Sequence, residues 1–159
     1  MHAWRICKEQ YSKKSFSGDG GLKAAGRWHH KGHRIVYTAQ SLSLATIELW
    51  VHVDPEEPLF TYVAVAADIP DNLVVQRFDE ADLPSNWRDD PGPTELRDLG
   101  TAWLRSQSSA VARVPSVATP GEFNYLLNPE HPDFGSIQIG TPIEFVFDRR
   151  MWKIREQKR

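Results

Sequence analysis

The sequence predicts a single α+β domain, residues 1–159, with a mixed, largely antiparallel β-sheet and flanking helices. Its 159 residues and 18.1 kDa are enough for one hydrophobic core but not for two. A hydrophobic share of 40%, with six Trp, indicates a globular chain rather than a disordered one. Short apolar runs typical of strands are interspersed with two helical patterns in no strict alternation, which favours an α+β architecture over a regular βαβ one.

The N-terminal third predicts two strands that flank a long polar segment. Residues 3–7 form a short apolar run and are followed by 8–32, a polar stretch with several glycines and no apolar periodicity. We expect a functional loop there, because long irregular segments in compact domains usually carry function. Residues 34–37 (RIVY) predict a second strand. Ser41 can then cap a helix that runs to about Val53 and is ended by Pro55.

The remaining elements are shorter and more varied. Residues 59–67 and 73–78 predict strands, and 79–93 predict an acidic connection. Thr94 is expected to cap a second helix that carries Leu96 and Leu99 on its apolar face. After it we expect a strand over 110–114 that Pro115 ends, a short mixed element over 123–128, and late strands over 137–139 and 143–147.

The net charge of −2 hides an uneven distribution along the chain. Residues 1–35 contain eight Lys or Arg against two acids, whereas residues 54–98 contain twelve acids against three Arg, and 149–159 are basic again. A nucleic-acid-binding surface usually needs a wider basic excess, so we expect no direct nucleic-acid binding. A basic N-terminal third suits a compact anionic ligand better, although each of these cations alone is more often a solvated loop charge.

Cysteine content and hydropathy predict a cytoplasmic protein. Cys7 is the only cysteine, so the chain can form neither an internal disulfide nor a cysteine metal site, which agrees with a reducing compartment. No apolar stretch is long enough to span a membrane, and residues 1–6 are followed by charge rather than by an apolar signal core.

Glu48 is the strongest functional candidate from pattern alone. It is the only charged residue in the otherwise apolar helix over 41–53, which we expect to be largely covered, and at helical spacing it shares a face with Leu44, Ile47 and Val51. A buried, unpaired carboxylate is costly, so Glu48 needs a cationic or hydroxyl partner or must face a cavity. Two interpretations of Glu48 have roughly equal weight: a structural ion pair with Arg27 or Arg34, and a functional site.

The segment Gly26-Arg27-Trp28-His29-His30-Lys31-Gly32 is the second candidate. Glycines let backbone amides approach an anion, and arginine can bind a phosphate through two parallel hydrogen bonds. An ordinary charged surface loop is the alternative. His29, His30 and His33 lack a nearby carboxylate or cysteine, so we expect exposed loop histidines and no metal site.

Ser116 is a third candidate, because it offers a hydroxyl just after Pro115 ends a strand. A lone serine more often bonds its own backbone, and this alternative stays open. The glycine-rich patterns of dinucleotide-binding and triphosphate-binding loops and the Gly-x-Ser-x-Gly turn of hydrolases are absent from the sequence.

Taken together, these motifs resemble the RES-domain family, which is named for an arginine, a glutamate and a serine. Arg27 in GRWHHKG, Glu48 in SLATIELWVH and Ser116 in RVPSVATPGEFNYLLNP follow the family's order. VYTA precedes the glutamate helix, an Asn-Pro pair follows the serine, and the likeness extends from Trp4-Arg5 to the closing FVFDRRMW. The resemblance implies a fold similar to ADP-ribosyltransferase toxins, and NAD as a substrate with no separate cofactor.

The resemblance also implies roles for individual residues. Arg27 would bind the pyrophosphate of NAD, and Glu48 would hydrogen-bond the nicotinamide ribose and stabilise the oxocarbenium-like charge that develops as nicotinamide leaves. Tyr37 would stack on or hydrogen-bond the substrate, and Ser116 would orient the ribose or the nicotinamide amide. Asn124 and Arg5 are weaker substrate-binding candidates, and for Arg5 a structural salt bridge is at least as plausible.

The implied function is that of a toxin in a bacterial type II toxin–antitoxin system. Such a toxin would cleave the nicotinamide–ribose bond of NAD with water or phosphate as acceptor, which depletes NAD and arrests growth. The alternatives are an ADP-ribosyltransferase that modifies a specific protein and a binding module without chemistry. Implied partners are an Xre-type helix-turn-helix antitoxin that blocks the active site and a second copy in a homodimer, to which exposed Trp87 or Trp103 could contribute, although burial suits a single Trp better.

Overall fold

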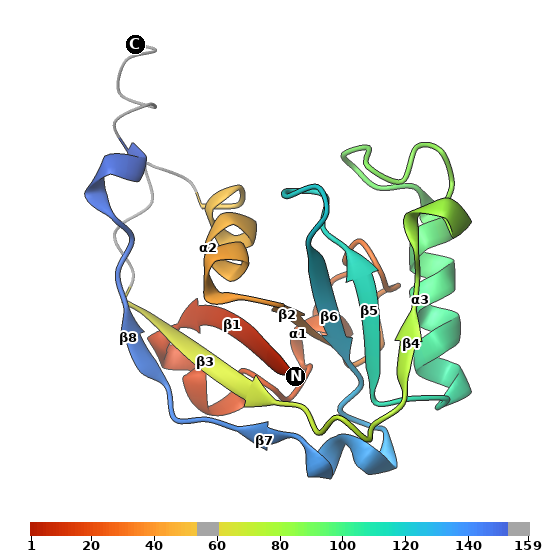
Figure 1. Cartoon of the computed structure of the whole chain (residues 1–159), viewed down its shortest axis with the longest axis horizontal. Helices are drawn as coiled ribbons and strands as arrows, with labels where there is room; N and C mark the ends of the chain where they lie inside the picture. The colour runs from red at the N-terminus through yellow and green to blue at the C-terminus, as the bar shows by residue number, and fades with distance from the viewer. Residues whose placement is uncertain (54–60, 153–159) are drawn as a thin grey trace.

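The computed structural model describes residues 1–53 and 61–152, which form one mixed sheet with helices beside it (Figure 1). The strand order is β4-β5-β6-β2-β1-β3-β7, with β8 also paired to β3. β4 and β5 are parallel, and the other strand pairs in the described residues are antiparallel. The predicted α+β class and largely antiparallel sheet are confirmed. The strands are β1 (His2–Lys8), β2 (Val36–Ala39), β3 (Tyr62–Asp68), β4 (Val75–Arg77), β5 (Val111–Pro115), β6 (Phe123–Leu127), β7 (Gln138–Ile139) and β8 (Ile143–Phe145).

The sheet divides between β1 and β2, and this division places the site. β1 pairs with β3 over its whole length, but it meets β2 at a single residue pair, Trp4 with Ala39. In Figure 1 the β1–β3 half therefore runs at a steep angle to the upright β6–β5–β4 half, and α2 (Leu42–Trp50) stands where the halves separate. Side chains from both halves of the sheet can therefore reach the space between β1 and β2.

Apolar residues cover both faces of the sheet. One core contains alternate residues of β1, β2, β3, β5 and β6, among them Val36, Val65 and Leu127. The other core lies between the opposite face and α3 (Thr94–Ser106), with Leu96 and Leu104 fully or nearly fully buried. The second core packs β5 and β6 against α3, so residues on that helix have fixed positions relative to the sheet.

One of the two predicted helix caps is confirmed, and the other is wrong. Ser41 caps α2, because its Oγ accepts a hydrogen bond of 3.1 Å from the Leu44 amide. Thr94 does not cap α3, since Pro93 occupies the capping position in an extended conformation and Thr94 is already the first helical residue. α2 ends at Trp50, before the predicted end near Val53, and the expected stop at Pro55 lies outside the described residues.

The segment over 8–32 is not a continuous loop as predicted. It contains a 3₁₀ helix, η1 (Glu9–Lys14), and a short helix, α1 (Gly20–Lys23). Gly21 allows this compact arrangement, because an added Cβ would lie 2.1 Å from the His33 carbonyl oxygen. Close backbone contacts of this kind leave no apolar periodicity in the sequence, which is why the pattern indicated a loop.

The remaining boundaries differ from the predicted ones by a few residues. Of residues 123–128, expected as a mixed element, 123–127 form β6, and the late strands are shorter than expected. Short 3₁₀ helices occupy three of the connections, and they are η2 (Glu80–Asp82), η3 (Pro132–Ser136) and η4 (Arg149–Trp152). Residues 59 and 60 of the predicted third strand lie outside the described residues.

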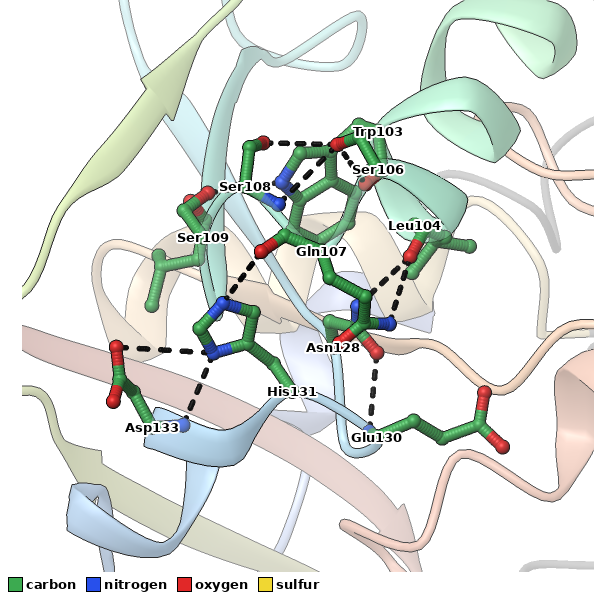
Figure 2. A network of polar contacts seen from close by, with 11 residues as sticks. Trp103, Leu104, Ser106, Gln107, Ser108, Ser109, Asn128, Glu130, His131 and Asp133 are labelled. Atoms are coloured by element: carbon green, nitrogen blue, oxygen red, sulfur yellow. Dashed lines mark hydrogen bonds and ion pairs between the residues drawn. The ribbon is translucent and has the colours of Figure 1, made fainter.

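Trp87 and Trp103 are buried, with 5% and 4% exposure, so neither supplies the exposed surface suggested for a dimer contact. Trp103 instead belongs to a polar network at the end of α3 (Figure 2), where its Nε1 donates to Ser109 Oγ at 2.9 Å. In the same network Asn128 Nδ2 and Gln107 Nε2 both donate to the Leu104 carbonyl. Carbonyls at a helix C-terminus lack intrahelical partners, so these bonds anchor the end of α3 to the sheet. None of the helices built from described residues has the length and apolar character needed to cross a membrane.

Candidate active site

A cavity of about 750 Å³ lies at the division of the sheet, within the size range of ligand pockets. Residues from both halves of the sheet, from α2, from α3 and from several connecting segments contribute to its wall. These residues are 4–6, 25–28, 37–39, Ala45, Glu48, Leu49, Val51, His52, 90–92, Arg97, Val114, Pro115, Val117, Ala118 and Asn124. The cavity therefore brings together Arg5, Arg27, Tyr37, Glu48 and Asn124, five of the six residues singled out from the sequence.

Glu48 lines this cavity from α2 and is held by two neutral donors. Its Oε1 accepts a hydrogen bond of 2.7 Å from Ser116 Oγ and one of 2.6 Å from Asn124 Nδ2. No hydrogen bond to Oε2 is formed by the described residues. The structural ion pair considered for Glu48 is not formed with Arg27 or with Arg34, which pairs with Asp19 instead. The carboxylate is thus oriented while no cation of the described residues pairs with it, so it can respond to positive charge on a ligand.

The prediction that the Glu48 helix is largely covered is wrong. Leu44 and Ala45 are buried, but Ile47 and Val51 are 38% and 54% exposed. Among the described residues, α2 packs mainly on β1 and β2, and Trp50 at its end also contacts the Phe147 ring. Its apolar residues on the outer side therefore lie at the surface, close to the cavity.

Ser116 is completely buried and does not line the cavity. It follows β5 directly, and besides donating to Glu48 its Oγ accepts a hydrogen bond of 3.0 Å from the Thr119 amide. Its position makes it a residue that orients Glu48 rather than one that touches a ligand. Asn124 lines the cavity from β6, opposite Val114 in the β5–β6 pair, and its buried Oδ1 has no hydrogen-bond partner among the described residues.

Arg27 forms part of the cavity wall and also holds it in place. Its Nη1 donates to the carbonyl oxygens of Trp87 and Asp89, both at 2.9 Å. Gly92 lies directly against the guanidinium group, because an added Cβ would be 2.6 Å from Nη1. Arg27 thus attaches the 87–92 segment to the cavity through one nitrogen, and its other nitrogens form no hydrogen bond to a described residue.

Tyr37 contributes its ring to the cavity, while its hydroxyl is bonded inside the protein. The hydroxyl accepts from the Trp28 amide at 3.0 Å and lies 2.8 Å from His29 Nδ1. His29 Nε2 lies 3.1 Å from the Ala24 carbonyl, which can only accept, so Nε2 carries the proton and Nδ1 accepts from Tyr37. This geometry fits stacking by the Tyr37 ring better than a hydrogen bond from its hydroxyl to a ligand.

Burial shifts both members of this pair towards their neutral forms. Desolvation raises the pKa of Tyr37 far above its usual value, against the opposing effect of the Trp28 amide and of Arg27 and Arg97. Desolvation likewise lowers the pKa of His29, which is 3% exposed. The expectation of exposed loop histidines is therefore wrong for His29, because the segment folds back and places its ring against β2.

Arg5 spans the gap between the diverging strands. Its Nη1 donates to the Tyr37 carbonyl at 2.9 Å, and its buried Nε has no hydrogen-bond partner among the described residues. Burial lowers the pKa of this guanidinium. The salt bridge considered for Arg5 is not formed with any described carboxylate, so its charge remains available to the cavity.

Sequence reasoning missed Arg97, Asp90 and His52, which also line the cavity. Arg97 lies on α3 and donates from Nε to the Gly26 carbonyl at 3.1 Å. Its only sequence signal is a charge next to the buried Leu96 on an amphipathic helix, which many surface arginines share. In residues 1–53 and 61–152 no three His, Cys, Asp or Glu side chains gather where they could hold a metal ion, and His30 pairs with Asp98.

Comparisons with known proteins agree with this arrangement. The family model described as "RES domain" matches residues 2–148. The chain belongs to the RES-domain family. Among its RES relatives, a protein named "Toxin Res" from Yersinia enterocolitica is 39% identical over 95% of this chain and 99% of its own length. Another, named "Prs ADP-ribosylating toxin", from a Sphingobium species, is 35% identical over 93% of this chain and 94% of its own length.

The fold has a solved counterpart as well. A chain in the crystal structure of the M. tuberculosis MbcT–MbcA toxin–antitoxin complex matches with a TM-score of 0.76 and 16% sequence identity. The match covers 91% of this RES chain and 84% of that chain. At this identity the likeness shows a shared fold, which supports the sheet and helix arrangement described above.

Proposed function

We propose that this protein is the toxin of a toxin–antitoxin system and that it cleaves the nicotinamide–ribose bond of NAD. Membership in the RES-domain family and the names of its relatives support the first part. One observation carries the second: Glu48 presents a carboxylate with one oxygen held by Ser116 and Asn124 and the other unbonded by described residues, in a cavity that also contains Arg27.

The chemistry needs little beyond this carboxylate. As the bond between nicotinamide and ribose breaks, positive charge moves onto the sugar, and a nearby oriented carboxylate stabilises it. Nicotinamide leaves as a neutral molecule, so no general acid is required. Water or phosphate then adds to the ADP-ribose cation. The two neutral donors, Ser116 and Asn124, orient Glu48 for this step.

The other cavity residues suit the remaining parts of NAD. Arg27 offers a guanidinium for the diphosphate, and the Tyr37 ring offers a flat surface for a base or for nicotinamide. Asn124 and Arg5 border the same cavity and can contact the ribose or the amide. Ser116 acts through Glu48, because it has no surface in the cavity.

The decisive experiment measures nicotinamide release from NAD by the purified protein, with and without phosphate. Glu48→Gln keeps the size of the side chain and removes its charge, so release should fall by at least about 100-fold, a loss typical of removing an electrostatic stabiliser. Glu144→Gln is the matched control, because Glu144 is exposed on β8. A fully active, folded Glu48→Gln protein would remove Glu48 from the mechanism.

Transfer of ADP-ribose to a protein is the second candidate, and the Sphingobium relative's name favours it. Incubation of the protein with labelled NAD and a cell lysate separates the two. Label on one protein band supports transfer, and free ADP-ribose supports NAD degradation. NAD that binds and is recovered intact from both assays would support a binding module without chemistry.

We further propose a cognate antitoxin as partner, of the Xre helix-turn-helix type, that blocks the cavity. The solved MbcT–MbcA structure, whose fold this chain shares, is a toxin–antitoxin complex. Co-expression with a helix-turn-helix protein encoded next to this chain should give a stable complex that no longer releases nicotinamide. Light scattering on the isolated chain tests the proposed homodimer, since a monomer mass would contradict it.

A further inference from the structure

We propose that Arg97 is a second substrate-binding arginine, which binds the diphosphate of the dinucleotide together with Arg27. This inference rests on the proposed function and extends it to a residue that neither the family's three named positions nor the sequence motifs include. Arg97 lines the same cavity as Arg27 but reaches it from α3.

The position of Arg97 is fixed by the contact between α3 and that segment. Its Nε donates to the Gly26 carbonyl, one residue before Arg27. Gly100, one turn further along α3, lies so close to the segment that an added Cβ would be 1.8 Å from the Trp28 carbonyl oxygen. Since the helix and the segment are in direct contact on both sides of Arg27, both arginines are fixed where they line the cavity.

The hydrogen bonds leave much of both guanidinium groups available. Arg27 uses Nη1 for two backbone carbonyls, and Arg97 uses Nε for one. Within the described residues, Nη1 and Nη2 of Arg97 make no hydrogen bond. Each of these arginines is held by carbonyl oxygens, which orient a guanidinium without neutralising it.

The absence of a described carboxylate partner, which Arg27 and Arg97 share with Arg5, distinguishes them from several other arginines. Four other arginines form ion pairs with a described carboxylate: Arg34 with Asp19, Arg88 with Glu80, Arg113 with Asp79, and Arg150 with Asp148. Arg27 and Arg97 are partly buried, yet neither forms an ion pair with a described residue. Two oriented, partly desolvated and unneutralised guanidinium groups at one wall favour an anionic ligand with two adjacent charges.

A diphosphate fits this requirement. Each of its two phosphates carries one negative charge, and each can accept two hydrogen bonds from one guanidinium fork. A single arginine could neutralise only one of the two phosphates. With Arg97 included, two guanidinium groups balance the charge of the diphosphate, and the Glu48 carboxylate in the same cavity stays free to act on the ribose.

The test is a binding measurement in a Glu48→Gln background, so that NAD and its products are not consumed. Calorimetry compares ADP-ribose, which contains the diphosphate, with nicotinamide riboside, which contains no phosphate. Arg97→Gln should weaken ADP-ribose binding about 10- to 100-fold, the loss expected for hydrogen bonds to a charged group. It should leave riboside binding unchanged and reduce the salt dependence of ADP-ribose binding.

Arg105→Gln is the matched control, because Arg105 lies on the same helix but does not line the cavity. Arg97→Lys keeps the charge but loses the fork, so it should recover part of the affinity. Equal weakening of both ligands would show that Arg97 only supports the fold of the wall and would overturn the inference. Unchanged ADP-ribose binding in Arg97→Gln would also overturn it while the proposed function stands. Failure of the parent protein to bind either ligand would overturn the proposed function and this inference together.

Discussion

At the scale of single residues, the site depends on the way one carboxylate is oriented. Glu48 Oε1 accepts two short hydrogen bonds, one from the completely buried Ser116 directly after β5 and one from Asn124 on β6. These donors come from adjacent strands that the core holds rigidly, so the carboxylate direction is set by the sheet rather than by α2 alone. Orientation of this kind matters because catalytic geometry tolerates errors of only about 0.5 Å.

Ser116→Ala should therefore lower kcat and leave KM almost unchanged. The substitution removes one of the two donors to Glu48 and none of the cavity surface, so a loss of about 10-fold in turnover is expected from one charge-assisted hydrogen bond. Steady-state kinetics of nicotinamide release measures it. A rise in KM without a change in kcat would show that Ser116 contacts the substrate after all, and Ser43→Ala, an exposed serine on α2, serves as the control.

His29 should make the stability of the fold depend on pH. Burial lowers the pKa of His29 in the folded protein, so the unfolded chain binds more protons at moderately acidic pH. The contribution of neutral His29 is complete above the unfolded pKa of about 6.5 and is lost as pH falls from there through the folded pKa. Urea unfolding at pH 7.5 and at pH 5 measures the difference.

His29→Asn is the informative variant for this prediction. Its amide oxygen can accept the Tyr37 hydroxyl in place of Nδ1, and it does not titrate in this range. The slope of stability against pH should be smaller in the variant than in the parent. An unchanged slope would show that His29 is not the source of the pH dependence.

At the scale of elements, the contact between α3 and the 25–28 segment links the core to the site. Gly100 is essential there, because the Trp28 carbonyl oxygen occupies the place where any Cβ would lie. The end of α3 is anchored separately by Ser109 and Asn128 (Figure 2). The helix is thus held at its end by the sheet and in its middle by the segment that carries Arg27.

Gly100→Ala should destabilise the protein by about 2 kcal/mol, the usual cost of forcing an added group into a packed interior. It should also weaken ADP-ribose binding, since the segment that carries Arg27 must move away from α3. Gly135→Ala is the control, because an added Cβ at Gly135 meets nothing within 4 Å. Thermal unfolding and calorimetry test both effects, and a Gly100→Ala protein of parental stability would contradict the packing described.

At the scale of the whole molecule, local patterns predicted the elements better than their assembly. Ser41 and the following apolar run indicated α2 because capping and periodicity are local properties. The division of the sheet at Trp4 and Ala39 depends on how strands far apart in sequence diverge, and no local pattern encodes it. The exposure of Ile47 and Val51 follows from that division, so the prediction of a covered helix could not have foreseen it.

The same distinction applies to the site. A carboxylate in an apolar helix pointed to Glu48, because an unusual residue type stands out within one element. Arg97 did not stand out, since an arginine on an amphipathic helix is ordinary until the fold places it beside Arg27. Ser116 was singled out by its place after a strand end and then by the resemblance, but its burial and its bond to Glu48 are what indicate that it acts through Glu48.

The double attachment of Arg27 affects how mutants of this protein should be read. Its Nη1 bonds hold the Trp87 and Asp89 carbonyls. Replacing Arg27 would leave both carbonyl groups without this hydrogen-bond donor and would loosen an acidic segment at the surface. An inactive Arg27 variant could therefore result from a disturbed fold as readily as from a lost ligand contact. Substitutions of residues that border the cavity but form no such structural hydrogen bonds will report more directly on catalysis.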